Sequence, residues 1–167
     1  MAELRTIQEQ DAEQYLALCR QLDDETHFML LEPGERTTNV EEQRERIRTI
    51  LAGANKTIIL AEADGKLVGY IAGIGGDYRR NWKTVHIVIG VLQKYSGQGI
   101  GKRLFLALED WAVGIAIHRL ELTVMTHNQR GISLYQRMGY EVEGVKRDDL
   151  FVDGGYIDQY FMAKLLE

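Results

Sequence analysis

The chain has 167 residues, of which 45% are hydrophobic and 27% are charged, and its formal net charge is −5. A chain of this length can form one domain with a well-buried core. Its acidic balance argues against a surface that neutralises nucleic-acid phosphates, so we expect a single domain over residues 1–167 and no nucleic acid as a partner.

The first third of the chain predicts one strand and two helices. Leu4–Ile7 favours a short strand, and Asp11 is placed to cap a helix. An apolar segment with helix-breaking residues follows over Asp23–Thr38. Asn39 is placed to cap a second helix, Val40–Leu51. The apolar side of the first helix carries Ala12, Tyr15, Leu18, Cys19 and Leu22.

The middle of the chain predicts three strands. Two β-branched, apolar runs, Thr57–Ala63 and Lys66–Ile74, are separated by Asp64-Gly65, which is the strongest short-range hairpin pattern in the chain. We therefore expect two antiparallel strands here. Thr84–Leu92 is a third apolar run and favours a buried strand.

The last part of the chain predicts a helix, a strand, a second helix and a hairpin. After a glycine cluster and a helix, Arg119–Thr126 favours a strand, and Asn128 is placed to cap a helix that ends at Gly139. Tyr140–Val152 and Tyr156–Leu165 close the chain as strands. The helix after the glycine cluster has an apolar stripe of Ile100, Leu104, Leu108, Trp111 and Ile115. This order of elements predicts an α/β domain with a mixed sheet and helices on its faces.

The glycine cluster joins the third strand of the middle part to the helix that follows. Backbone N–H groups and a helix N-terminus converge there, so we expect an anion such as a phosphate. A Walker A loop is excluded because it needs glycine at Ser96 and serine or threonine at Arg103. A dinucleotide fingerprint is excluded because it needs a third glycine at Lys102 or Leu104. The cluster consists of Ser96, Gly97, Gln98, Gly99, Ile100, Gly101, Lys102 and Arg103.

The cluster resembles the pyrophosphate loop of the GNAT acetyltransferase superfamily, in which Arg or Gln precedes two residues, Gly, one residue, and Gly or Ala. Gly99 and Gly101 match this pattern, whereas Ser96 stands in place of Arg or Gln.

Two further segments match the superfamily in the same order along the chain. Asn128 followed by Leu134-Tyr135-Gln136-Arg137-Met138-Gly139-Tyr140 is similar to the family's Asn and its Leu-Tyr-x-x-x-Gly-Phe or Tyr. Tyr156–Met162 resembles the closing strand of several bacterial members. The resemblance spans roughly residues 57–165, and the first fifty residues match only in their helix-loop-helix layout.

The resemblance implies a GNAT-like fold, in which helices flank a central mixed, mainly antiparallel sheet. It also implies an N-acetyltransferase that moves an acetyl group from acetyl-coenzyme A (acetyl-CoA) to a primary amine by direct attack. In such an enzyme Tyr135 acts as general acid, Asn128 hydrogen-bonds the pantetheine arm or a water in its path, and the glycine cluster binds the pyrophosphate. The backbone that pairs with the pantetheine arm belongs to Ile89, Gly90 and Val91.

Candidates for a general base and for acceptor contacts follow from the same resemblance. Many members carry Glu five residues before the valine that corresponds to Val91, and this chain has His86 there. An imidazole with a pKa of ~6.5 suits an amine acceptor, although a structural role for His86 fits equally well. His127 is a second candidate. Phe28 and Met29 lie in the segment that covers the acceptor side in the superfamily, where they either contact the substrate or pack onto the core.

Three features remain open. Without the family's Glu and with Ser96 in the loop, the chain also fits a non-catalytic domain that binds acetyl-CoA and signals through a partner. Another acyl donor, such as succinyl-CoA, would use the same chemistry. Protein N-termini, polyamines, aminoglycosides and small amines are all possible acceptors, of which a small amine or a peptide N-terminus is preferred.

The closing hairpin is placed to pair across a two-fold axis, so a homodimer is expected.

The sequence also indicates a cellular compartment. Cys19 is the only cysteine, so neither an internal disulfide nor a cysteine-based zinc site can form, and no metal-ligand cluster is visible. The first ten residues lack the apolar core of a signal peptide, and no run approaches the ~18 apolar residues of a membrane span. We expect a cytoplasmic protein with no metal and no membrane contact.

Overall fold

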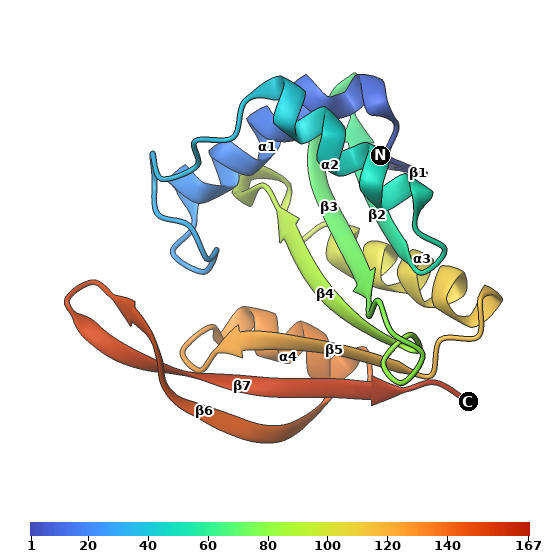
Figure 1. The fold of residues 1–167 in the computed structure, drawn as a ribbon. Coiled ribbons are helices and arrows are strands. Elements are labelled where there is room, and N and C mark those ends of the chain that lie inside the picture. Colours follow the sequence, from blue (N-terminus) through green and yellow to red (C-terminus); the bar gives the residue numbers. More distant parts are fainter.

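The computed structural model describes residues 1–167 and contains one open sheet of seven strands, in the order β1-β2-β3-β4-β5-β7-β6 (Figure 1). Only β4 and β5 run parallel; all other neighbours are antiparallel. The strands are β1 Glu3–Thr6, β2 Lys56–Ala63, β3 Lys66–Gly75, β4 Thr84–Val91, β5 Arg119–Met125, β6 Glu141–Val152 and β7 Gly155–Leu165. The helices are α1 Ala12–Glu25, α2 Val40–Ala52, α3 Ile100–Gly114 and α4 Gln129–Arg137. The predicted mixed, mainly antiparallel sheet with flanking helices is confirmed. None of the helices is long and apolar enough to cross a membrane.

Both hairpin turns consist of an Asp-Gly pair with positive φ angles. Asp64 and Gly65 have φ of 52° and 74°, and Asp153 and Gly154 have φ of 49° and 82°. Two-residue turns with positive φ at both positions match the twist of the flanking strands, and Asp-Gly adopts them at low cost. The predicted hairpins β2–β3 and β6–β7 are confirmed, and β7 begins at Gly155, one residue earlier than predicted.

The parallel contact between β4 and β5 is short. Thr84–His86 pairs with Arg119–Glu121, and beyond this point the two strands share no ladder. β4 continues along β3 as far as Val91, and β5 continues along β7 as far as Met125. The sheet therefore opens into two halves, β1–β4 and β5–β7–β6, which diverge in Figure 1.

Helices cover both faces of the β1–β4 half, with α1 and α2 on one face and α3 on the other (Figure 1). Two glycines show how closely they pack. A Cβ atom at Gly73 of β3 would lie 2.9 Å from Cδ1 of Leu108 in α3, and one at Gly90 of β4 would lie 2.8 Å from Cδ1 of Leu22 in α1. Contacts this short leave no space for a larger side chain at either position.

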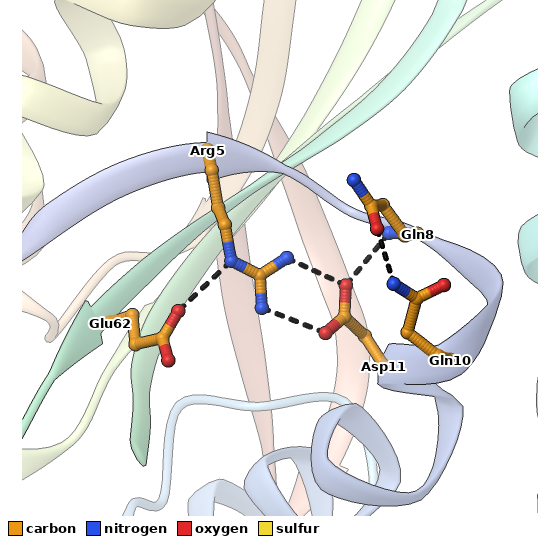
Figure 2. Close-up of polar contacts among 5 residues, drawn as sticks. All are labelled: Arg5, Gln8, Gln10, Asp11 and Glu62. Atoms are coloured by element: carbon orange, nitrogen blue, oxygen red, sulfur yellow. Dashed lines mark hydrogen bonds and ion pairs between the residues drawn. The ribbon is translucent and has the colours of Figure 1, made fainter. Parts of the chain in front are cut away.

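The N-terminal strand is tied to the start of α1 by Arg5 (Figure 2). Asp11 occupies the N-cap position of α1, as predicted, but its side chain makes no capping bond to that helix. Its carboxylate instead accepts the backbone N–H of Gln8 at 2.7 Å and two N–H groups of Arg5, each at 2.8 Å. Arg5 also donates from Nε to Glu62 of β2 at 2.9 Å. One guanidinium therefore joins β1, β2 and the short 3-10 turn Glu9–Asp11 before α1.

Asparagine side chains cap two helices as predicted. Asn39 Oδ1 accepts the N–H of Glu42 at 2.9 Å at the start of α2, and Asn128 Oδ1 accepts the N–H of Gly131 at 3.0 Å at the start of α4. α1 is longer than predicted and runs to Glu25. Asp23, which the sequence placed in the following segment, is a buried residue of this helix because its carboxylate is paired with Arg36.

The Arg5 contact makes the stability of the fold depend on pH. The hydrogen bonds from Arg5 hold the pKa of Asp11 below its usual value, so the stabilisation is complete above about pH 4 and is lost as the pH falls through the lowered pKa of the folded state. We expect Asp11→Asn to lower the free energy of unfolding by about 1.5–3 kcal/mol at neutral pH. In urea titrations this difference from the wild type should shrink below about pH 4; a difference that stays constant would contradict it.

A second prediction concerns Tyr140, whose side chain is 2% exposed and whose hydroxyl group has no hydrogen-bond partner. Its ring packs on Phe105 with centroids 5.4 Å apart. Because a buried hydroxyl without a partner has lost its bonds to water, we expect Tyr140→Phe to stabilise the protein by about 1 kcal/mol. Thermal unfolding should show a Tm higher by about 2–4 °C. A lower Tm would show that an ordered water satisfies the hydroxyl.

Candidate active site

A cavity of about 930 Å³ opens where β4 and β5 part. The end of α1, the loop after it, the end of β4, the glycine cluster and α4 form its walls. Apart from the second base candidate His127, which is described below, all but three of the predicted site residues line it. These lining residues are Phe28, Met29, Ile89, Gly90, Val91, Ser96, Gly97, Gly99, Ile100, Gly101, Lys102, Asn128 and Tyr135.

Three predicted residues lie outside the cavity wall. His86 is half-buried at the start of β4, between Ile74 of β3 and Glu121 of β5, and about 13 Å along the strand from Gly90 at ~3.3 Å per residue. Arg103 donates from Nη1 to the carbonyl oxygen of Ala2 at 2.7 Å, which directs its charge toward the N-terminal strand. Gln98 is exposed at the tip of the glycine cluster.

The glycine cluster presents a row of unpaired backbone donors. Gly97 and Gly99 have φ of 76° and 81°, which fold the loop back before α3. At the two ends of the cluster, the N–H groups of Ser96 and Arg103 donate to the carbonyl oxygens of Gln93 and Gly99, each at 3.1 Å. The N–H groups of residues 97–102 have none. Free N–H groups at the N-terminus of a 15-residue helix favour the binding of an anion.

Basic side chains stand beside these donors. Lys102 and Arg130 both line the cavity, and a Cβ atom at Gly97 would lie 3.5 Å from Nη2 of Arg130. Arg130 was missing from the sequence prediction. Arg130 lies in the first turn of α4, where the helix dipole disfavours a positive charge. A bound anion would offset this unfavourable interaction, so the position of Arg130 favours an anion nearby. The Oγ of Ser96 donates to the carbonyl oxygen of Gln93 at 2.7 Å, so this hydroxyl group is not free to donate to an anion.

The hydroxyl-bearing ring of Tyr135 lies on the side of α4 that faces the cavity. It packs against Phe105 of α3 in an edge-to-face contact with centroids 5.5 Å apart. Burial raises the pKa of Tyr135 to about 12. The phenol is therefore a proton-bearing donor throughout the neutral range.

The end of α1 and the loop after it bring two further titratable groups to the cavity, Glu25 and His27. The Glu25 carboxylate accepts the N–H of Gln93 at 2.6 Å, which links α1 to the chain just before the glycine cluster. Phe28 packs against His127 at the end of β5 with ring centroids 5.2 Å apart. His127 thus contacts the predicted acceptor segment without lining the cavity itself.

Comparison with known proteins gives a consistent result. Residues 11–140 match the model of the Acetyltransferase (GNAT) family. The N-alpha-acetyltransferase RimI of Mycobacterium tuberculosis is 36% identical over 116 residues, which make up 68% of this chain and 69% of that protein. The structure of a GNAT-family acetyltransferase from Streptococcus pneumoniae is similar with a TM-score of 0.96 and 27% identity, over 99% of this chain and 100% of that one. The structure of yncA from Salmonella typhimurium with acetyl-CoA has the same fold, with a TM-score of 0.89, 18% identity, and coverage of 100% and 95%.

The family match covers more than half of the chain, and its motifs build one cavity. Its wall includes residues with free N–H groups in the glycine cluster, the unpaired end of β4 and the half-buried Tyr135. The resemblance found in the sequence is confirmed: the chain belongs to the GNAT family of N-acetyltransferases, enzymes that take their acetyl group from acetyl-CoA.

Proposed function

We propose that the chain acetylates a primary amine of a small molecule or a peptide N-terminus, and that Tyr135 is the general acid of this reaction. The observation that carries the proposal is the continuity of one cavity from five residues with free N–H groups, Gly97 and Gly99–Lys102, to the protonated phenol of Tyr135. Such a cavity accommodates a long anionic donor with its reactive group beside the phenol.

The cavity offers complementary partners for each part of acetyl-CoA. The pyrophosphate would bind the N–H groups of the glycine cluster, with Lys102 and Arg130 as counter-charges. The pantetheine amides would pair with Ile89–Val91, because β4 has no strand partner on the β5 side beyond His86. The free amide N–H₂ group of Asn128, whose oxygen is used in the cap, is a further donor to this arm.

Acetyl transfer then needs little rearrangement of the protein. The neutral amine attacks the thioester carbonyl carbon, the C–S bond breaks, and the nitrogen gives one proton to water while negative charge develops on the sulfur. The sulfur takes up a proton from water as it leaves as the free thiol. A thiol has an unperturbed pKa of ~8.5, so complete proton transfer from Tyr135 to the thiolate would cost about 5 kcal/mol. Tyr135 therefore acts chiefly by donating a hydrogen bond to the sulfur as the negative charge appears.

The cost of deprotonating the acceptor favours an α-amine. At neutral pH an α-amino group with a pKa of ~7.7–8.0 needs about 1 kcal/mol to become neutral, whereas a lysine-type amine needs about 4.6 kcal/mol. His86 lies outside the cavity, and the titratable groups on the acceptor side are Glu25 and His27. An α-amine requires the least help from a base, which agrees with the name of the mycobacterial relative, an N-alpha-acetyltransferase.

We also propose that the protein is a homodimer joined through its closing hairpin. β6 is an edge strand of 12 residues, so one row of its backbone groups is unpaired. Phe151 and Tyr156 near the hairpin turn are 62% and 69% exposed. Pairing of two hairpins would cover both the edge and these rings.

The first test is acetyl transfer by Tyr135→Phe. Free thiol release from acetyl-CoA is followed with pooled amines and with short peptides that carry a free N-terminus. We expect the wild type to release thiol only when an amine is present, and Tyr135→Phe to lower kcat about 100-fold with the Kd for acetyl-CoA within threefold.

The matched control is Tyr140→Phe, which removes the other hydroxyl group next to Phe105 but lies outside the cavity. It should leave kcat within about twofold. Acetyl-CoA binding without release from any amine pool would favour the non-catalytic domain, and equal rates for the two phenylalanine variants would exclude Tyr135 as the acid.

A second prediction concerns the anion site. Gly99 has a φ of 81°, and an L-residue in this region costs about 1–2 kcal/mol, so we expect Gly99→Ala to weaken acetyl-CoA binding about 5- to 30-fold in calorimetry. The control is Gly114→Ala at the end of α3, where a Cβ atom meets nothing within 4 Å and φ is not positive. Equal affinities for the two variants would contradict this assignment of the loop.

A further inference from the structure

The loop between α1 and α2 forms neither helix nor strand over residues 26–39, yet it supplies part of the cavity wall. Thr26, His27, Phe28 and Met29 line the cavity, and all four come from the beginning of this loop. The position of this wall therefore depends on whatever fixes the path of the loop as a whole.

A buried ion pair holds the far part of the loop to α1. Arg36 donates from Nε to Oδ2 of Asp23 at 2.7 Å and from Nη2 to Oδ1 at 3.1 Å. The Asp23 side chain is 2% exposed and that of Arg36 is 16% exposed. A planar guanidinium meets a carboxylate at two points, which fixes orientation as well as distance, whereas an ammonium group meets it at one.

Few other contacts hold this part of the loop. Among residues 30–37, Arg36 alone has a side-chain hydrogen bond to another part of the chain, since the bond from the N–H of Glu32 goes to Glu35 within the loop. At the end of the loop, Arg20 donates to the carbonyl oxygen of Thr38 at 2.9 Å. The path between Met29 and Thr38 therefore rests on Arg36.

The ion pair also adjoins a residue of the cavity wall, because Asp23 follows Leu22 of α1, which lines the cavity. Burial raises the pKa of Tyr70 and of Cys19, and the positive charge of Arg36 opposes both shifts. Tyr70 in turn supports Gly90, because a Cβ atom there would lie 3.3 Å from Cε1 of Tyr70. Gly90 lines the cavity.

We propose that the Asp23–Arg36 ion pair positions the acceptor wall of the cavity and thereby sets the affinity for the amine. The two side chains are positioning residues: they do not line the cavity, and they act through Phe28 and Met29. Acetyl-CoA binding is separate, since its proposed contacts lie on β4, the glycine cluster and α4. The inference rests on the proposed function, because it assigns the loop to the amine acceptor.

The test is Arg36→Lys, which keeps the positive charge and loses the two-point contact. We expect the KM for the amine to rise about five- to tenfold, as for the loss of one ordinary hydrogen bond, with kcat and the Kd for acetyl-CoA within about twofold. Hydrogen exchange in residues 27–37 should become faster by a similar factor, while exchange in α3 should not change. Arg48→Lys is the matched control, because Arg48 pairs on the surface with Glu9 and Glu45 and should change none of these quantities.

A double variant, Asp23→Asn with Arg36→Gln, removes both charges and avoids an unpaired buried carboxylate if Arg36→Lys does not fold. It should show the same selective rise in the KM for the amine. A folded variant with an unchanged amine KM and unchanged exchange would overturn the proposal, and so would equal rises in the amine KM and the acetyl-CoA Kd. If the wild type transfers no acetyl group, the proposed function fails, and the exchange measurement by itself still decides whether the ion pair fixes the loop.

Discussion

The short parallel contact between β4 and β5 is the constraint on which the rest of the structure depends. Three residues of each strand hold the two halves of the sheet together, and beyond them the strands part. A longer ladder would fill the hydrogen-bonding capacity of Ile89–Val91 and close the cavity. Unpaired strand groups inside a protein are costly, because buried N–H and C=O groups ordinarily have partners. We propose that in this chain these free groups bind the amides of the donor's pantetheine arm.

The two ends of the cavity are held in fixed relation by the packing of α3 on α4. A Cβ atom at Gly101, in the first turn of α3, would lie 3.0 Å from Cδ2 of Leu134 in α4. Glycine at this position thus lets the helix with the free N–H groups approach the helix that carries Tyr135. Phe105 of α3 contacts the Tyr135 ring from the same side. The anion site and the phenol therefore belong to one packed unit rather than to two independent loops.

Local patterns in the sequence predicted most of the elements, because turns and caps depend on residues that are close in the chain. The functions of charged residues were harder to predict, since their partners come from distant segments. In the sequence, Asp11 and Asp23 resemble ordinary acidic residues of a protein surface. In the structure, Asp11 accepts hydrogen bonds from Arg5 of β1, and Asp23 is buried in an ion pair with Arg36. Arg130 reaches the anion site only because α4 begins beside the glycine cluster. The candidate base His86 was placed by family spacing alone, and the sequence does not reveal where β4 leaves β5.

The narrow junction between the halves also bears on how the chain reaches its native state. Strands β1 to β4 lie in sequence order in the sheet, with a two-residue turn between β2 and β3, whereas β5 joins β4 only after the chain has crossed α3. Contacts between segments distant in sequence form later than local ones, so the cavity is completed late in folding. A donor that spans both halves, as we propose for acetyl-CoA, would bind the folded chain and not the unfolded one, and mass action would then favour folding. The amount of acetyl-CoA in the cell thus also helps to determine how much of this enzyme is folded.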